Sequence, residues 1–254
     1  MDRPTELLGV AELNELLEGR GLTVVPDVAS FDGMHNYAPE LYFEAGHSAL
    51  RHIRLAMLTA GLEQVDSVLD FASGAGRVLR TLMAAFPDAA LTASDVWKPG
   101  LQFCSEVLGV ETVESSFEPD EVDLEGQFDV IWCGSLLTHV DARKWTGFVK
   151  VFEALLAHGG VAVFTTYGRF TAEALRKREN TLSLTDEQIE QLLGDYDSTG
   201  FGYFERLPDE GLGDCVASRA WVGAQLDQAP TLQLVLYAEQ GWLGQDVIAC
   251  TKPA

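Results

Sequence analysis

The chain has 254 residues and a formal net charge of −22, from 39 acidic and 17 basic side chains. This charge repels phosphate backbones and anionic lipid headgroups, so we expect neither nucleic acid nor a membrane surface as a partner. Apolar residues make up 47% of the sequence, which is enough for a full core and argues against a disordered chain. The length fits one α/β domain with an elaboration.

The cysteines and the N-terminus bear on the cellular compartment. The four cysteines are scattered, without a Cys-x-x-Cys pair or a histidine at metal-ligand spacing, so we expect them to be reduced and mostly buried, and we expect no metal. The N-terminus is acidic and lacks a signal-like apolar core, and no run reaches the ~20 apolar residues of a membrane span. These features predict a cytoplasmic protein; they leave its oligomeric state open.

The N-terminal part is predicted to precede the main domain. A leucine pattern over residues 5–19 is typical of a helix, and the aromatic segment 22–43 is predicted to be irregular. We therefore expect residues 1–44 to form a helix and a lid-like segment over the site. The alternative is that aromatic side chains such as Tyr42 serve only packing. A helix over 47–60 follows and leads into the first strand.

The most informative stretch is 68–80, VLDFASGAGRVLR. A short apolar run ends at Asp70, crosses a turn of small residues and continues as a helix predicted over 77–86. Glycines permit positive φ and bring the backbone close to a ligand, and the new helix directs free N–H groups into the same space. The pattern indicates a nucleotide-like ligand, although dinucleotide enzymes and close-packed corners share it.

Four more strands are predicted before residue 170. The second ends on Asp95, the third lies near 111–115, the fourth covers 127–135, and the fifth lies within 160–168. Asp141 is suited to cap the helix between the fourth and fifth strands. Because strand and helix alternate, right-handed crossovers give an open, doubly wound sheet with its ligand crevice at the carboxyl ends of the strands.

The rest of the chain departs from this alternation. Residues 167–216 form an insertion after the fifth strand, and we interpret it as a cap that faces the substrate, because long insertions in compact domains are usually functional or disordered. A helix is predicted over 218–228. Two β runs around a short glycine-containing link, 232–250, predict a terminal hairpin, so one of its strands must run antiparallel to the others.

Asp95 narrows the choice of ligand. It lies 19 residues beyond Gly76, at the end of the second strand, where a carboxylate can accept hydrogen bonds from two vicinal ribose hydroxyls. This favours a nucleoside-bearing cofactor over a bare phosphate. The alternative is that Asp95 only caps the helix that follows it.

Across residues 45–251 the sequence resembles class I S-adenosylmethionine (SAM)-dependent methyltransferases. VLDFASGAGR resembles the first motif of that family, SDVW the second, and FDVIWCGSLLTH its fourth-strand segment. SRAWV and GWLGQDV resemble the end of a bacterial subgroup of such enzymes. The resemblance implies a Rossmann-like, mostly parallel seven-stranded sheet with an antiparallel terminal hairpin, formed by a SAM-binding domain of residues 45–254.

The resemblance also implies where SAM is bound. The first-strand carboxylate would orient the amino-acid end of the cofactor, and the glycine loop would contact its methionine and ribose. The second-strand carboxylate would bind the ribose hydroxyls, residues after the second and third strands would flank the adenine, and a pair after the fourth strand would line the methionine side. These residues are Asp70, Ala72, Gly74, Ala75, Gly76, Asp95, Val96, Trp97, Ser116, Phe117, Gly134 and Ser135.

Two positions depart from the family pattern. Ala72 stands where the first motif has a glycine, which is a small change. Ser115 and Ser116 stand where the family often has an acid after the third strand, so the adenine contacts are less well defined by the sequence.

The acceptor side is harder to infer. His139 is the candidate general base, because an imidazole titrates near neutral pH and this one follows the fourth strand; the alternative is a histidine bonded within a turn. Candidate acceptor contacts are Tyr42, Tyr167, Arg169, Tyr203 and Trp242.

The function that we predict is methyl transfer to a small-molecule or glycan-type, sugar-linked acceptor, as O- or N-methylation. Two alternatives are kept open. The same loop and acid occur in nicotinamide-dependent oxidoreductases, and the lack of a second strong catalytic residue also fits a SAM-binding protein without activity.

Overall fold

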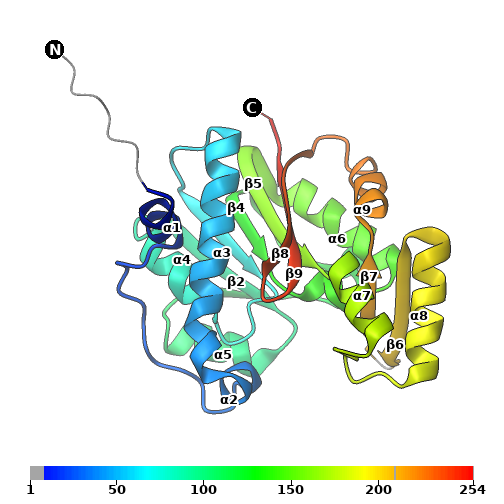
Figure 1. Ribbon diagram of the computed structural model, residues 1–254. Helices are drawn as coiled ribbons and strands as arrows, with labels where there is room; N and C mark the ends of the chain where they lie inside the picture. The colour runs from blue at the N-terminus through cyan, green and yellow to red at the C-terminus, as the bar shows by residue number, and fades with distance from the viewer. Residues whose placement is uncertain (1–8, 209, 254) are drawn as a thin grey trace.

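The computed structural model describes residues 9–208 and 210–253. Its centre is a seven-stranded sheet with the order β3-β2-β1-β4-β5-β9-β8 (Figure 1). The first five strands pair in parallel, whereas β9 lies between β5 and β8 and is antiparallel to both. The strands are β1 (Ser67–Phe71), β2 (Ala90–Asp95), β3 (Glu111–Glu114), β4 (Phe128–Cys133), β5 (Leu156–Thr166), β8 (Gln233–Trp242) and β9 (Gln245–Thr251). The predicted α/β class and the reversed terminal strand are confirmed.

Helices cover both faces of this sheet, as a doubly wound fold requires. The helices outside the insertion are α1 (Val10–Glu18), α2 (Gly33–Tyr37), α3 (Pro39–Ala60), α4 (Leu79–Ala85), α5 (Lys98–Glu106), α6 (Ala142–Leu155) and α9 (Arg219–Leu226), with 3₁₀ turns η1 (Pro119–Glu121) and η2 (Leu136–Thr138). Of these, α1 and α2 pack against α3. As predicted, the Asp141 side chain caps α6, accepting a hydrogen bond of 2.8 Å from the Lys144 amide. None of the helices within the described ranges combines the length and apolarity that a membrane crossing needs.

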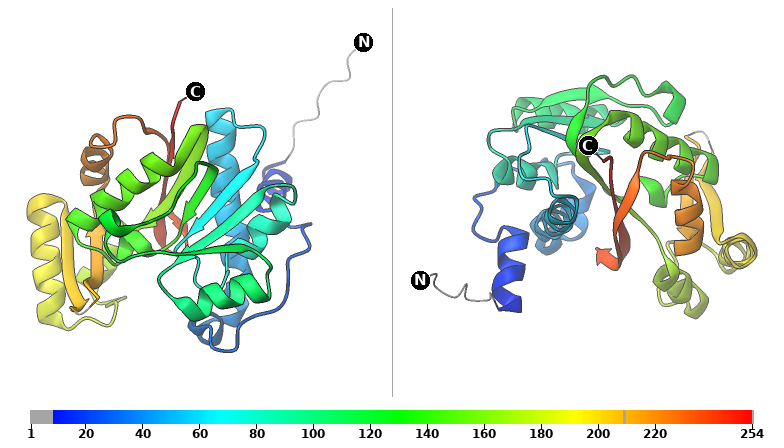
Figure 2. Two further views of the ribbon diagram at one scale, coloured as in Figure 1. Left: turned by 180° about the vertical axis from the view of Figure 1, so that it is seen from behind. Right: turned by 90° about the horizontal axis from the view of Figure 1, so that it is seen from above.

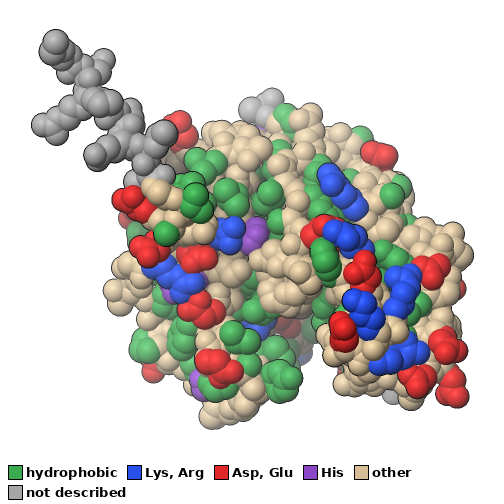
Figure 3. All heavy atoms as spheres, in the orientation of Figure 1, with side chains coloured by type: hydrophobic (Ala, Val, Ile, Leu, Met, Phe, Trp, Pro, Cys, Tyr) green, Lys and Arg blue, Asp and Glu red, His purple; other side chains and the backbone are tan. Residues whose placement is uncertain are grey.

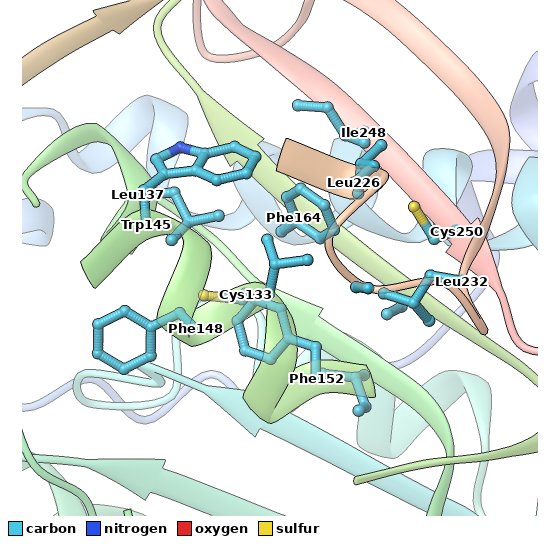
Figure 4. Close-up of a cluster of buried hydrophobic side chains, with 14 of the residues drawn as sticks. Cys133, Leu137, Trp145, Phe148, Phe152, Phe164, Leu226, Leu232, Ile248 and Cys250 are labelled. Carbon is cyan, nitrogen blue, oxygen red and sulfur yellow. The ribbon is translucent and has the colours of Figure 1, made fainter. Parts of the chain in front are cut away.

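Alternate residues of the central strands face two separate cores. On one face, α6 and α9 pack against the sheet, and Figure 4 shows Trp145, Phe148 and Phe152 of α6 beside Phe164 of β5. The rings of Phe71 and Phe152 meet edge to face at 5.5 Å. Removing one of these buried rings costs roughly 3–5 kcal/mol of stability. The cysteines at 104, 133, 215 and 250 are all buried and free, as expected.

On the other face, α3 and α4 pack against the sheet. Small residues of α3, among them Ala45 and Ala49, let this helix approach closely. The helix begins at Pro39, earlier than the sequence analysis predicted, and α2 precedes it; the prediction of an irregular segment over 22–43 is wrong for this part. The cause lies in the start signals, because Pro39 occupies the first turn of α3 and the Asp32 side chain caps α2.

The insertion of residues 167–216 forms a small unit beside the main sheet (Figure 2). It contains α7 (Arg169–Lys177), α8 (Asp186–Thr199) and a two-stranded antiparallel sheet of β6 (Phe201–Leu207) and β7 (Leu212–Ala217). The sequence analysis did not predict this hairpin. Its strands lack a clean alternation of apolar and polar residues, because β7 is buried along most of its length and β6 only at its start.

The basic side chains of this region are neutralised locally. Figure 3 shows blue and red side chains intermixed over α7 and α8. Arg176 pairs with Asp197, and Arg178 pairs with Asp186. The basic residues 176–178, at the end of α7, therefore form a solvated face on which both arginines are paired.

Candidate active site

Two adjoining hollows lie at the carboxyl ends of the parallel strands. The first hollow, of about 210 Å³, is lined by the ends of β2, β3 and β4. The second hollow, of about 530 Å³, extends from the glycine loop after β1 to the insertion and the terminal hairpin. Both are lined by Ala72, Gly134, Ser135 and His139, so the two hollows meet at these residues. This is the edge at which doubly wound sheets bind ligands.

The glycine loop presents bare backbone to the second hollow. Ala72 and Gly74 both have positive φ, of 61° and 57°, and a side chain added at Gly74 would meet no atom within 4 Å. Gly76 has another task, because a Cβ there would lie 2.5 Å from Leu108 Cδ1. Gly76 therefore lines neither hollow and instead lets the loop pack against the segment after α5.

Asp95 joins the loop to the end of β2. Its Oδ2 accepts a hydrogen bond of 2.7 Å from the Gly74 amide, and its Oδ1 accepts one of 2.8 Å from the Trp97 amide. The carboxylate lines the first hollow and is largely buried, and this burial raises its pKa. The predicted capping role and a ligand role are compatible, since each carboxylate oxygen keeps a further lone pair.

Asp70 and Ser73 carry unsatisfied polar atoms beside the loop. Asp70 is buried and lines neither hollow, and its Oδ2 has no hydrogen-bond partner within residues 9–208 and 210–253. Burial, and then the nearby Asp95, raise the pKa of Asp70 to about 8. Ser73 lines the second hollow, and its buried hydroxyl also lacks a partner among the described residues. A polar ligand on this loop would satisfy a group that the fold leaves open.

The structure brings most predicted cofactor residues to the two hollows. The predicted residues that line the first are Ala72, Asp95, Val96, Ser116, Phe117, Gly134 and Ser135; those that line the second are Ala72, Gly74, Ala75, Trp97, Gly134 and Ser135. The pattern fits a nucleoside with an amino-acid tail, because an apolar hollow beside Asp95, suited to the base and ribose, continues into a more polar hollow beside the loop.

His139 lies where the hollows meet and is oriented by the insertion. Its Nδ1 is 2.9 Å from the carbonyl oxygen of Gly213 and 3.4 Å from Oδ1 of Asp214. Because a carbonyl can only accept, Nδ1 carries the proton, and in the neutral ring Nε2 keeps its lone pair. The Asp214 carboxylate is 3% exposed, and its Oδ2 lies 2.6 Å from Nε of Arg206.

Of the predicted acceptor contacts, only Tyr167 lines a hollow, the second one. Tyr42 is buried and donates a hydrogen bond of 2.7 Å to Asp32 Oδ2. Trp242 is buried too, and its Nε1 donates to the carbonyl of Ala45. Aromatic side chains are suited both to a core and to a binding site. Here Tyr42 and Trp242 pack in the core, where Asp32 and the Ala45 carbonyl accept their hydrogen bonds.

The other two predicted contacts also lie away from the hollows. Arg169 pairs with Glu239 and stacks on Phe170 at the surface of α7, because an exposed carboxylate is within its reach. Tyr203 lies on β6 and packs against the aromatic core, which buries its hydroxyl.

Residues that the sequence analysis missed complete the second hollow. They are Asp32, Gly33, Met34, Ser73, Arg77, Leu243 and Gln245. The N-terminal segment reaches the hollow because the buried Arg80 donates to the carbonyl oxygens of Val25 and Asp27 and fixes this segment against α4. Arg77 could have been assigned to the site from the sequence, because it directly follows the glycine loop. Its guanidinium stacks on Trp242, and burial lowers its pKa.

Strained backbone gathers at the second hollow. Ala72, Ser135 and Leu243 are three of the seven non-glycine residues with positive φ in the described chain. Each such residue costs about 1–3 kcal/mol and persists only where the surroundings over-determine it. At Ser135 the surroundings are a ring of hydrogen bonds, from Ser135 N to Thr165 Oγ1, from Thr165 Oγ1 to Gln245 Oε1, and from Gln245 Nε2 to Ser135 Oγ, of 2.8, 2.5 and 2.8 Å.

Comparison with known proteins agrees with this geometry. Residues 68–160 match the family model of a methyltransferase domain. The matched segment runs from β1 into β5 and includes the glycine loop, Asp95 and His139. A comparison with curated proteins found no match.

Solved methyltransferases share the fold over most of this chain. A SAM-dependent methyltransferase from Clostridium acetobutylicum ATCC 824 is 15% identical with a TM-score of 0.60, covering 87% of this chain and 98% of that one. DesVI from Streptomyces venezuelae is 15% identical with a TM-score of 0.59, over 90% and 100%. Magnesium protoporphyrin IX methyltransferase from Synechocystis PCC 6803, solved with bound SAH, is 12% identical with a TM-score of 0.54, over 92% and 93%. At these identities the likeness concerns the fold.

Proposed function

We propose that the chain is a class I SAM-dependent methyltransferase that transfers the methyl group to a small-molecule or sugar-linked acceptor, as an O- or N-methyl group, in the second hollow. The observation that carries this proposal is the composition of that hollow. The cofactor loop forms one wall, and His139, Tyr167 and Gln245 form the other. A volume of about 530 Å³, shared with the cofactor's amino-acid end, suits a compact polar acceptor.

SAM supplies a methyl group on a sulfonium, which is reactive enough that the protein need only bind and align its partners. We propose that the backbone of Gly74 and Ala75 and the hydroxyl of Ser73 hold the amino-acid end, together with the buried guanidinium of Arg77. The Asp95 carboxylate would accept hydrogen bonds from the two ribose hydroxyls. Val96 and Phe117 would flank the adenine in the first hollow.

His139 is the proposed general base. The Gly213 carbonyl holds the proton on Nδ1, which leaves Nε2 to accept a proton from the acceptor. The buried Asp214 carboxylate, 3.4 Å from Nδ1, would stabilise the imidazolium that forms. Both Gly213 and Asp214 belong to β7, so the insertion would act by orienting the base as well as by covering the acceptor.

We also propose a division of the chain around this site. Residues 45–254 would form the SAM-binding domain, and residues 167–216 its substrate cap. The lid-like role proposed for 1–44 is supported by Asp32, Gly33 and Met34, which line the second hollow, and by the edge-to-face contact of Phe31 with Trp97 at 5.5 Å. Residues 1–8 of that segment lie outside the described residues.

Calorimetry followed by an activity assay tests the proposal. We expect SAM and S-adenosylhomocysteine (SAH) to bind with a stoichiometry of one and NAD(H) not to bind. We then expect SAM-dependent methylation of at least one member of a panel of small hydroxyl and amine compounds and sugars. A folded protein that binds SAH but methylates only a macromolecule would contradict the proposed acceptor class.

A further inference from the structure

Resting on this proposed function, which leaves the acceptor atom open, we infer that the acceptor atom is a hydroxyl oxygen that accepts a hydrogen bond from Ser135 and donates its proton to His139. Two features support this inference. They are the direction of the hydrogen bonds around Ser135 and the tautomer of His139.

The ring of hydrogen bonds fixes which groups donate. Thr165 Oγ1 accepts from the Ser135 amide at 2.8 Å and gives its only proton to Gln245 Oε1 at 2.5 Å. The amide nitrogen of Gln245 must then face Ser135, and it donates to Ser135 Oγ at 2.8 Å. Ser135 Oγ is thus an acceptor inside the ring. Its own proton bonds to no other described residue, and the side chain lines both hollows.

His139 offers the complementary group. Its Nδ1 donates to the Gly213 carbonyl, so Nε2 of the neutral ring is an acceptor. The charged and titratable side chains around it are Asp214 and Arg206 of the insertion hairpin, Tyr167 after β5 and Asp95 across the first hollow. Ser135 and His139, which line both hollows, therefore offer a hydrogen-bond donor and an acceptor at their junction.

A hydroxyl group matches this pair. One of its lone pairs accepts from Ser135, its proton bonds to His139 Nε2, and the second lone pair remains for attack. In the transfer, this lone pair forms the new bond to the methyl carbon, the electron pair of the carbon–sulfur bond goes to sulfur, and the hydroxyl proton moves to His139 Nε2. The new ether and the thioether product carry no charge on oxygen or sulfur. The single positive charge, first on the sulfonium, is now on the imidazolium.

A neutral amine does not match. Its nitrogen has a single lone pair, so accepting a hydrogen bond from Ser135 would occupy the electrons that must attack the methyl carbon. Ser135 Oγ keeps a second acceptor lone pair beside the bond from Gln245, so an amine N–H could bond to it, but the Ser135 proton would then be left without an acceptor in the site. The arrangement therefore selects oxygen over nitrogen.

The strained backbone at Ser135 supports a functional role for its hydroxyl, which glycine could not supply. Its φ of 68° is a conformation that glycine adopts without strain and serine does not. Ser183 has a similar φ of 62° but is exposed on the insertion and lines neither hollow. Ser183→Gly is therefore a matched control for Ser135→Gly, because both changes remove a hydroxyl and relax the same strain.

The test uses acceptors that offer both atoms, namely methyl amino-deoxyglucopyranosides, together with phenol and aniline as a separated pair. Binding to SAH-saturated protein is measured by ligand-detected NMR, and the position of a methyl group transferred from SAM is read by carbon-13 NMR. We expect methylation on oxygen. Ser135→Gly should weaken the binding of the hydroxyl probe and lower its turnover at least tenfold, while SAH affinity changes far less and Ser183→Gly changes none of these.

Methylation on nitrogen would overturn the hydroxyl assignment and leave the proposed function standing. Equal probe binding and turnover by Ser135→Gly and the unaltered protein would overturn it as well. No transfer to any of these acceptors by protein that binds SAH would count against both the hydroxyl assignment and the proposed acceptor class.

Discussion

The two hollows are built from different kinds of sequence. The first hollow is lined almost wholly by residues between 71 and 139 that lie at the carboxyl ends of β1, β2, β3 and β4 or in the loops after them. The far wall of the second hollow is made of three distant segments: Asp32–Met34, Tyr167, and Leu243–Gln245. The cofactor side therefore depends on local chain geometry, whereas the acceptor side depends on how remote segments pack.

This difference has a consequence for mutagenesis. The proposed contacts on the cofactor side use backbone amides and three polar side chains, those of Ser73, Arg77 and Asp95, so few side-chain changes should affect cofactor binding, but those that do should have large effects. Contacts on the acceptor side use oriented side chains, so changes there should alter turnover and leave SAH affinity in place. Each prediction below separates these two sides.

The largest expected effect is on turnover, in His139→Ala. Loss of a positioned general base lowers the rate by roughly 10²–10⁴-fold. The affinity for SAH, measured by calorimetry, should change little, because no predicted cofactor contact depends on this side chain. Turnover equal to that of the unaltered protein would return His139 to a structural role.

Asp214→Asn sharpens this prediction. It should lower turnover by about tenfold, because the change removes the buried negative charge, 3.4 Å from Nδ1, that would stabilise the imidazolium. In the His139→Ala background the same change should have no further effect on turnover, because Asp214 would act only through the imidazole. An equal loss of turnover in both backgrounds would show that Asp214 supports the fold and not the base.

Asp95→Asn tests the other side. The carboxylate binds two backbone amides and is proposed to accept two ribose hydroxyls. Its neutralisation should weaken SAH binding by about 100-fold, since charge-assisted hydrogen bonds contribute roughly 1.5–3 kcal/mol each. The exposed Asp227→Asn is a control for charge alone. Unchanged SAH affinity in Asp95→Asn would contradict the assignment of the first hollow to the nucleoside.

Asp70 gives a pH-dependent prediction for the same side. Its pKa is raised from 3.8 to about 8 in the folded protein, so between these values the folded chain holds a proton that the unfolded chain has lost. Stability should therefore fall as pH rises across this window, by up to ~1.4 kcal/mol per pH unit from this group. Asp70→Asn should unfold at a similar urea concentration to the unaltered protein near pH 4 and at a higher one near pH 8. A constant difference between the two proteins would contradict burial of a protonated Asp70.

The contrast between the hollows also explains what the sequence could predict. The five parallel strands, the glycine loop, Asp95 and the reversed hairpin were predictable, because each depends on a short run of residues with its own periodicity or turn chemistry. Asp95 in particular is placed by the end of β2 alone. The same local logic brought Ser116, Phe117, Gly134 and Ser135 to the hollows.

The acceptor side was predicted poorly for a physical reason. Tyr42 and Trp242 are as aromatic as a pocket wall requires, but tertiary packing buries both, and no local pattern distinguishes the two outcomes. Gln245 lies 110 residues beyond Ser135, and only the pairing of β9 with β5 brings them together. Asp214 could not be linked to His139 because the β6–β7 hairpin that carries it had not been predicted.

The smallest expected effect concerns the turn between β8 and β9. Leu243 and Gly244 connect the paired residues Trp242 and Gln245, and both have positive φ, of 49° and 79°. A two-residue turn of this kind favours Asn-Gly, so Leu243→Asn should stabilise the fold by about 1 kcal/mol. The midpoint of thermal unfolding should rise by roughly 2–4 °C.

Leu243 also lines the second hollow, so Leu243→Asn should lower turnover or change acceptor preference without altering SAH affinity. The control is Gln240→Asn, which relaxes a φ of 52° at an exposed position that lines neither hollow and should leave turnover unchanged. A more stable Leu243→Asn protein with unaltered acceptor kinetics would remove Leu243 from the acceptor wall. A less stable one would show that packing of the leucine side chain, and not the acceptor, retains the strained turn.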